Sequence, residues 1–351
     1  MSATKSSNWG LHIRQNMGFS IAVVLFVIVY FLYHLAHPKG FSSQVLIQNS
    51  NEVFSLALLS MAQTVPVLLG GLDLSVGAVM TLVDCLASHL LEGTGATVGF
   101  GLIACLFAGA LAGFVNGCVV VFGRIQPIIA TLATGAVYMG LALFLRPIPG
   151  GKINEDINWA MTNALGDFAE TVGIFDDGKA AWFQPIAGIP VALVLLIVVA
   201  SITWVPFRRS VTGRTVYAIG SAEGAAYMSG LNIDRGKLAA FTLAGFFAGV
   251  AGVFMAIQTS SGNADIPMAG AYTLSSIASV VIGGTSLLGG TGGAIGSIFG
   301  TLILKVISFN FRVFDIAPLL QPLFEGVVLL AAVSLGALSI LRVKNQLELF
   351  R

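Results

Sequence analysis

Long apolar runs separated by short polar links occupy most of the chain. Each run is long enough, or nearly so, to cross a hydrocarbon core of about 30 Å as a helix. Neither the alternation typical of half-buried strands nor a long polar domain interrupts them. The pattern predicts an all-α polytopic membrane protein, a single transmembrane domain over residues 1–351. Its ten spans are expected at 19–35, 53–70, 74–91, 96–122, 127–145, 186–205, 238–257, 272–289, 292–310 and 318–341.

Composition supports a membrane protein and excludes several other classes. Hydrophobic residues make up 56% of the 351 residues and charged residues only 9%, against about 25% charged in soluble domains. The net charge of +1 provides no basic surface for nucleic acid. The three cysteines lie within apolar runs and are interpreted as packing residues, not as a disulfide scaffold.

The distribution of positive charge predicts the orientation of the spans. With ten spans and the N-terminus inside, eleven Lys and Arg residues fall on the inner side, five fall on the outer side, and Lys305 lies within a span. Because short cytoplasmic loops carry an excess of Lys and Arg, both termini are expected to be cytoplasmic.

Two segments outside the spans are long enough to bind a partner. Residues 146–185 form an outer (periplasmic) loop with six acidic and three basic residues, a local charge of minus three. Residues 207–237 form a basic inner loop that contains a short helix-like stretch near 222–229. An ordinary solvated loop remains the alternative for both, more so for the outer one.

The chain contains 42 glycines, and many of them lie within the spans. Four-residue repeats such as Gly109, Gly113 and Gly117 form a flat stripe that lets another helix approach closely. Residues 70–77 and 283–290 instead place paired glycines beside polar side chains between two apolar runs. Broken backbone at membrane depth is tolerated only where protein buries it or where it lines a cavity, so both segments are expected to interrupt helices.

Ionisable residues within the spans are few, and the uncharged polar ones suit a neutral solute. A proton- or sodium-driven transporter usually has several buried carboxylates, whereas the spans here contain little beyond Asp73, Asp84 and Glu325. Amide and hydroxyl side chains such as Asn116, Gln126 and Thr131 are suited to hydrogen bonding with a polyhydroxylated molecule. Each of them is also compatible with simple helix packing.

Motifs for catalysis and for nucleotide binding do not occur. The glycine-rich runs contain no lysine and do not fit G-x-x-x-x-G-K-[ST], so the chain is not expected to hydrolyse ATP. There is no H-E-x-x-H, C-x-x-C or G-x-S-x-G motif. The sequence predicts no catalytic residue, no metal site and no cofactor of its own.

Four segments, in order along residues 44–341, resemble the permeases of ribose-type bacterial ABC importers. The first, GGLDLSVGAVM at 70–80, is similar to the G-G-I-D-L-S-V-G signature of that family. The others are NG at 116–117 with RIQPIIATL at 124–132, VYAIG at 216–220 with the residues up to 233, and IASVVIGGTSL at 277–287. Departures occur at Ala222 and Tyr227, where asparagine and arginine are common, and in the longer outer loop. They leave the identity of the sugar open.

The resemblance implies a type II ABC-importer fold and a division of labour between chains. This chain is then the permease of the bacterial inner membrane, paired with a second permease, identical or paralogous. An ATPase subunit binds ATP and Mg, and a periplasmic sugar-binding protein delivers the solute; lipid surrounds the spans and nucleic acid has no role. The implied solute pathway includes Asp73, Ser75, Asn116, Gln126, Thr131, Thr285 and Ser286. The implied ATPase-coupling residues are Glu223, Gly224, Ala225, Ala226 and Gly230.

Two alternatives from other classes remain at this point. An ion-coupled secondary transporter of a small polar solute requires no ATPase partner, and a membrane-embedded enzyme requires turnover by this chain alone. For Asp73 itself, the alternative to a pathway residue is a carboxylate that caps the following helix.

Overall fold

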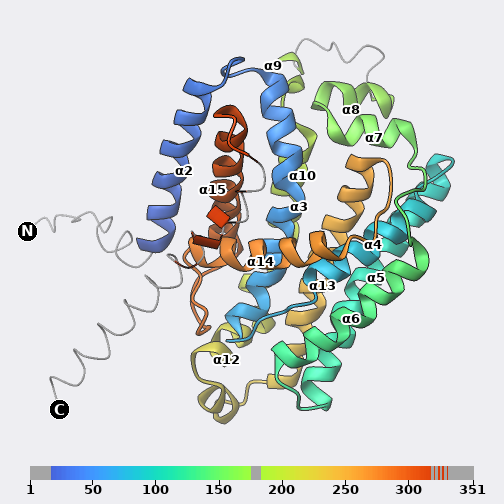
Figure 1. The fold of residues 1–351 in the computed structure, drawn as a ribbon. Helices are drawn as coiled ribbons and strands as arrows, with labels where there is room; N and C mark the ends of the chain where they lie inside the picture. The colour runs from blue at the N-terminus through green and yellow to red at the C-terminus, as the bar shows by residue number, and fades with distance from the viewer. Residues whose placement is uncertain are drawn as a thin grey trace, which may run out of the picture.

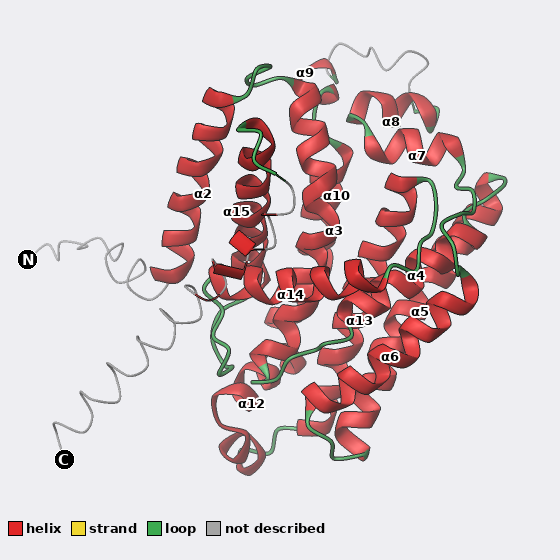
Figure 2. Ribbon diagram, in the orientation of Figure 1, coloured by secondary structure: helices red, strands yellow, loops and turns green. Residues whose placement is uncertain are grey.

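The computed structural model describes residues 17–174, 183–317 and isolated positions between 320 and 330, and the account below concerns these residues. Figure 2 shows that they form helices and loops, without a strand. The helices are α2 (Met17–Ala36), α3 (Ser43–Leu68), α4 (Val76–Leu90), α5 (Gly95–Phe122), α6 (Pro127–Leu145), α7 (Glu155–Thr162), α8 (Leu165–Thr171), α9 (Gln184–Ala187), α10 (Val191–Val199), the π-helix η1 (Ala200–Trp204), α11 (Val205–Arg209), α12 (Val211–Met228), α13 (Ile233–Thr259), α14 (Ile266–Ile282) and α15 (Ala294–Val313).

Nine of the ten expected spans overlap apolar helices, with bounds that differ in places, and the tenth, 318–341, falls largely outside the described residues. Six helices are long and apolar enough to cross a membrane: α3, α5, α6, the continuous α10–η1–α11 unit, α13 and α15. The described part of α2, together with α4 and α14, is apolar but shorter. The chain is therefore a multi-pass membrane protein, and two of the shorter helices adjoin glycine-rich breaks, α4 after residues 69–75 and α14 before residues 283–293.

Helix α3 begins ten residues before the expected 53–70 span. Ser42 caps its start, with the hydroxyl accepting a hydrogen bond from the Val45 amide at 3.3 Å. The first turns of α3 are rich in polar residues, so the apolar run that predicted the span begins only at residue 53. In the structure most of them, including Asn49 and Asn51, lie against other parts of the protein.

The span expected at 272–289 is wrong in its position. Helix α14 runs over Ile266–Ile282, and residues 283–293 form a loop. Figure 1 shows α14 lying at a large angle to α3 and α15, across the bundle. The two glycine-rich segments do interrupt helices, as expected: residues 69–75 separate α3 from α4, and residues 283–293 separate α14 from α15.

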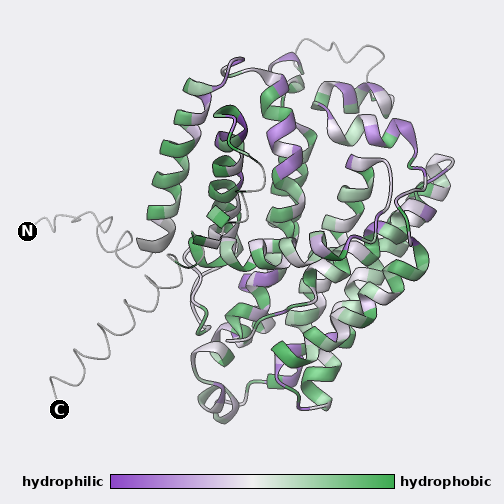
Figure 3. Cartoon of the chain, viewed as in Figure 1, coloured by the Kyte–Doolittle hydropathy of each residue, from purple (hydrophilic) through white to green (hydrophobic). Residues whose placement is uncertain are grey.

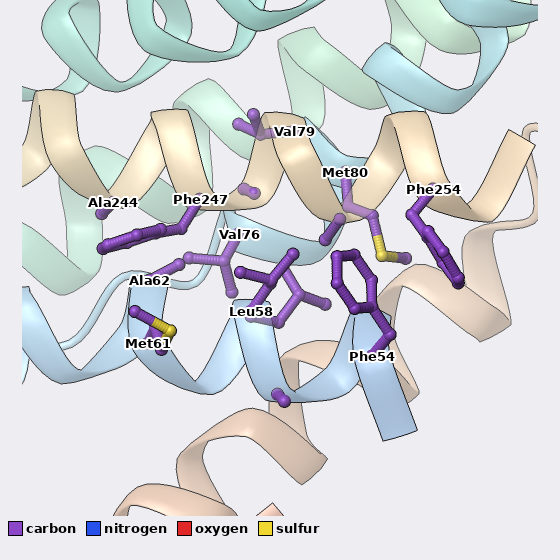
Figure 4. Packing of buried hydrophobic residues seen from close by; sticks show 14 of the residues in the cluster. Phe54, Leu58, Met61, Ala62, Val76, Val79, Met80, Ala244, Phe247 and Phe254 are labelled. Carbon is purple, nitrogen blue, oxygen red and sulfur yellow. The ribbon is translucent and has the colours of Figure 1, made fainter. Parts of the chain in front are cut away.

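The hydrophobic core lies where α3, α4 and α13 meet. Figure 4 shows side chains of these helices packed together, among them Phe54 and Leu58 of α3, Val79 of α4, and Phe247 and Phe254 of α13. In contrast, α5, α6 and α10 bury only one face and leave large apolar side chains exposed. In Figure 3 the ribbon is mostly green along the long helices of the bundle and shows more purple on α7 and α8. An apolar outer surface is what a lipid environment requires.

The glycine stripes serve close helix packing, as predicted. Gly109 and Gly113 of α5 lie directly against Gly245 and Gly249 of α13. A Cβ atom at Gly113 would lie 2.2 Å from the Phe241 carbonyl oxygen, and one at Gly245 would lie 2.3 Å from that of Gly109. Such contacts leave no room for a side chain, so the glycines fix the separation of the two helices.

Replacing Gly113 with leucine should therefore separate α5 from α13. We expect Gly113→Leu to destabilise the fold by at least about 1–3 kcal/mol, the usual range for an overpacked core. The measurement is the thermal unfolding midpoint of the purified chain in detergent. Gly140→Leu on α6 is the matched control, because nothing lies within 4 Å of a Cβ atom there. Equal midpoints for the two variants would contradict the assigned packing.

Candidate functional site

The candidate site begins with the break between α3 and α4. Gly70 has φ +81, a left-handed conformation that favours glycine. The backbone of this break is held by side chains of two helices. Gln63 of α3, with its amide oriented to satisfy both partners, donates to the Asp73 carbonyl at 2.8 Å and accepts from the Asp73 amide at 3.2 Å. Thr131 of α6 accepts from the Leu74 amide at 2.9 Å. The backbone N–H and C=O groups at the break therefore have hydrogen-bond partners within the chain.

The Asp73 carboxylate organises the local turn. Its Oδ1 atom accepts hydrogen bonds from the Ser75 amide at 2.8 Å and from the Ser75 hydroxyl at 2.6 Å. This is an Asx-type turn, in which an aspartate bonds its own backbone two residues on. The residue at the N-cap of α4 is Ser75, not Asp73. Asp73 is only 2% exposed, so in this conformation its carboxylate is enclosed by protein.

A chain of hydrogen bonds extends from Asp73 to α5 and α6. The Asn116 amide nitrogen donates to the Ser75 hydroxyl at 2.7 Å, and the Tyr138 hydroxyl donates to Asn116 Oδ1 at 3.0 Å or to the Ala112 carbonyl at 2.8 Å. All these side chains are buried. Tyr138 was not among the residues identified from the sequence, although a tyrosine inside an apolar helix usually needs a hydrogen-bond partner.

The second break, residues 283–293, lies against the first. Gly284, Gly289, Gly290 and Gly292 all have positive φ, and the Gly290 amide donates to the Leu68 carbonyl at the end of α3 at 3.0 Å. Thr285 is buried, and its hydroxyl accepts from the Gly293 amide at 3.1 Å. The two glycine-rich segments therefore meet at the same end of the molecule.

The seven residues implied as a solute pathway separate into two groups. Asp73, Ser75, Asn116 and Thr131 come together around the first break, and Thr285 fixes the second; all five are buried. Gln126, at the start of α6, is exposed, and Ser286 is half-buried. The buried residues use their polar atoms to hold the breaks, whereas Gln126 and Ser286 remain accessible.

The inner-loop helix forms where the sequence indicated. Helix α12 is interrupted at Ala222, whose φ of −166 and ψ of 97 are not helical, so residues 223–228 make a separate short helix. Gly230 follows it with φ +77, as a left-handed C-terminal glycine should. Its tip is well exposed: Tyr227 is 73% and Met228 88% exposed.

Two of the implied coupling residues have contacts within the chain. Ala225 is exposed, whereas Ala226 is only 4% exposed and packs against the chain in this conformation. Glu223 forms an ion pair with Lys237 of α13, with Nζ to Oε1 at 2.6 Å. That pair fixes the short helix to the start of α13. Glu223, Gly224 and Gly230 line a shallow pocket of about 930 Å³ beside Tyr227 and Met228.

The first part of α12 contacts both breaks. A Cβ atom at Gly220 would lie 1.8 Å from the Leu68 carbonyl oxygen, and the Tyr217 hydroxyl donates to the Gly292 carbonyl at 2.8 Å. Burial raises the pKa of Tyr217, with a smaller opposing effect from Arg208, so this hydroxyl stays a donor at neutral pH. Movement of α12 would therefore be transmitted directly to residues 69–75 and 283–293.

The acidic loop lies at the opposite end from α12. Figure 1 shows α7, α8 and α9 at one end of the bundle and α12 at the other. Glu155 and Asp156 are exposed in the first turn of α7, and Asp176 and Asp177 are outside the described residues. Within the described ranges no group of three or more His, Cys, Asp or Glu residues is placed to hold a metal ion.

Replacing Asp73 with alanine should unfold the turn, whereas replacing it with asparagine, the corresponding amide, should not. In Asp73→Asn an oxygen can still accept from both Ser75 donors; in Asp73→Ala the Ser75 amide is left buried without a partner. We expect Asp73→Ala to cost about 1–3 kcal/mol and Asp73→Asn clearly less. Thermal unfolding of the purified variants checks this, and equal losses would show that the carboxylate charge itself is required.

Comparison with known proteins identifies the family. The family model described as "Branched-chain amino acid transport system / permease component" matches residues 46–333. The ribose import permease protein RbsC of Bacillus subtilis is 30% identical over 324 residues, covering 92% of this chain and 93% of the relative. That of Haemophilus influenzae is 28% identical, covering 95% and 97%. The D-allose transport system permease protein AlsC of Escherichia coli is 29% identical, covering 84% and 83%.

No solved structure matches the chain. The family match nevertheless covers most of the sequence and includes both glycine-rich breaks and the whole of α12. The chain therefore belongs to this permease family, and its relatives place it with the ribose-type import permeases.

Proposed function

We propose that this chain is the membrane-spanning subunit of an ATP-binding-cassette importer that carries a monosaccharide or related polyol across the bacterial inner membrane. A separate ATPase subunit binds ATP and Mg and supplies the energy. A second permease, identical or paralogous, completes the pathway, and a periplasmic binding protein delivers the solute. Relatives named as ribose and D-allose permeases support the class of solute.

The observation that carries the proposal is the exposed helix at 223–228 and its anchorage. The tip presents Tyr227 and Met228 to a partner, while the preceding part of α12 lies against both breaks. A partner that moves the tip as a rigid body would shift the backbone at the breaks. This arrangement suits a permease that is driven by a separate partner protein. An ion-coupled carrier needs no such protruding contact.

The topology that we propose has ten spans with both termini in the cytoplasm. The excess of Lys and Arg supports this orientation, since α11 and α12 carry Arg208, Arg209 and Arg214 at the end that would be cytoplasmic. The separation of α7–α9 from α12 is consistent with one loop on each side of the membrane.

For the solute pathway we propose that the breaks shape the channel and that accessible polar side chains touch the solute. Gln126 and Ser286 are accessible in this conformation. Asp73, Ser75, Asn116, Thr131 and Thr285 would act mainly by holding the break geometry, and would reach the solute only if the breaks rearrange during transport.

The outer loop is the surface we propose for the binding protein. Glu155 and Asp156 project from the first turn of α7, where the helix dipole also favours negative charge. Trp159 is exposed on the same helix. An acidic surface with an exposed aromatic residue suits a basic partner surface, and such docking should weaken with increasing salt.

Uptake in whole cells and in reconstituted vesicles tests the function. We expect the tagged chain to co-purify with an ATPase, and vesicles holding the complex to accumulate labelled ribose or another monosaccharide only with ATP and binding protein. An uncoupler of the proton gradient should leave uptake in the vesicles unchanged. Uptake by this chain alone that an uncoupler abolishes would establish the secondary transporter instead.

The tip of the short helix should decide coupling to the ATPase. Met228→Glu places a charge on an apolar contact surface, so we expect at least about a tenfold loss of ATPase co-purification, equivalent to 1.4 kcal/mol, and a loss of solute-stimulated ATP hydrolysis. Val172→Glu, a comparable exposed position on the opposite end, is the control and should retain the ATPase. Full stoichiometry and stimulation in Met228→Glu would exclude this helix as the coupling element.

A further inference from the structure

We propose that Asp84 is the positioning residue that makes transport respond to the binding protein. Its carboxylate holds the loop between α13 and α14, residues 260–265, against the outer end of α4, so that docking on α7 is transmitted to the two breaks. This inference rests on the function proposed above. Asp84 is only 5% exposed and is not one of the implied pathway residues. An ionisable group within a span is costly and usually marks a function.

The Asp84 carboxylate is bonded to the loop and not to its own helix. Its Oδ2 atom accepts a hydrogen bond from the Asn263 amide at 2.9 Å. Its Oδ1 atom has no hydrogen-bond partner among the described residues. The buried carboxylate therefore makes one specific polar contact, which attaches residues 260–265 to α4.

Glycine lets the loop lie directly on α4. A Cβ atom at Gly262 would lie 2.5 Å from the Ser88 hydroxyl oxygen and 3.0 Å from the Asp84 carbonyl oxygen, so a larger residue would displace the loop. The Ser88 hydroxyl is itself fixed, because it donates to the Cys85 carbonyl at 2.7 Å and accepts from Arg146 Nε at 2.8 Å. The loop thus has one defined position on the outer end of α4.

The docking surface on α7 is joined to the same loop. The backbones of Gly150, shortly before α7, and Gly262 pair through two hydrogen bonds, at 3.1 and 2.8 Å. Within α7, the Asn158 side chain donates to the Ile257 carbonyl near the end of α13. One of these contacts lies in the loop and the other just before it, so a displacement of α7 would reach the loop directly.

Helix α14 connects the loop to both breaks. Asp265, the last residue of the loop, caps the start of α14. Thr273 of α14 accepts from the Gly77 amide in the first turn of α4 at 3.1 Å, and a Cβ atom at Gly77 would clash with the Ala269 carbonyl oxygen. The helix ends at Ile282, where the second break begins. Figure 1 shows α14 between α7 at one end and α12 at the other, so the breaks can respond to a partner on either side.

Hydrogen exchange of the full purified chain in nanodiscs tests the attachment itself. Asp84→Ala leaves the Asn263 amide without its acceptor, so we expect residues 260–270 to exchange at least about fivefold faster. Asp84→Asn keeps an oxygen in place and should restore most of the protection. Thr81→Ala is the matched control, because Thr81 is buried one turn earlier on α4 but bonds to the Gly77 carbonyl of its own helix. Unchanged exchange in Asp84→Ala would overturn the proposal, whatever the chain transports.

ATP hydrolysis by the complex with the ATPase and the binding protein tests the role in transport. We expect Asp84→Ala to keep its affinity for the binding protein and its basal hydrolysis, and to lose at least about fivefold of the stimulation by the binding protein. Asp84→Asn should restore the stimulation. Full stimulation in Asp84→Ala, or an equal loss of affinity, basal hydrolysis and stimulation, would contradict a positioning role.

A second variant tests the same loop without changing a charge. Gly262→Ala displaces the loop from Ser88 and should reduce the stimulation as Asp84→Ala does. Gly270→Ala on α14 is its control, because nothing lies within 4 Å of a Cβ atom there. Equal stimulation in the two glycine variants would contradict the proposal. A wild-type chain that binds neither partner would refute the proposed function and the coupling role with it, whereas the exchange experiment would still establish or exclude the attachment.

Discussion

A helix that is interrupted inside a membrane leaves backbone N–H and C=O groups without partners, and each unpaired group costs several kcal/mol in hydrocarbon. The break at residues 69–75 exists because this requirement is met inside the protein. Gln63 bonds both backbone groups of Asp73, and Thr131 accepts from the Leu74 amide. The Asp73 carboxylate satisfies Ser75. Since these partners lie on α3 and α6, the position of those helices and the shape of the break depend on each other.

The fold also requires close contact between the backbones of neighbouring helices, and glycine makes this contact possible. The stripes on α5 and α13 bring these helices together, and Gly220 brings α12 against the end of α3. Gly290 joins the second break to the same point through the Leu68 carbonyl. As a result, the exposed helix at one end of the molecule and the two breaks form one connected unit. A displacement applied at Met228 would therefore reach the membrane interior through backbone contacts, which deform less than long side chains.

The sequence and the structure agree where local pattern decides. Apolar runs predicted the helices, and the four-residue glycine repeats predicted a close helix contact, which α5 and α13 form. A glycine after an alanine-rich stretch predicted the end of the helix at 223–228. They disagree where a side chain's partner is distant in sequence. Helix α14 lies across the bundle and not along it, and Ala226 is buried although its neighbours in the short helix are exposed. Tyr138 joins the Asp73 network through Asn116, 22 residues away. No local pattern reports such a partner.

By itself, the sequence determined the membrane environment, the helical class, the places where helices break and the permease family, because these follow from hydropathy, glycine spacing and short motifs. The tertiary structure decided what the polar residues do. Asp73, Asn116 and Thr131 could equally have faced a solute or one another, and the choice depends on which helices lie within hydrogen-bonding distance.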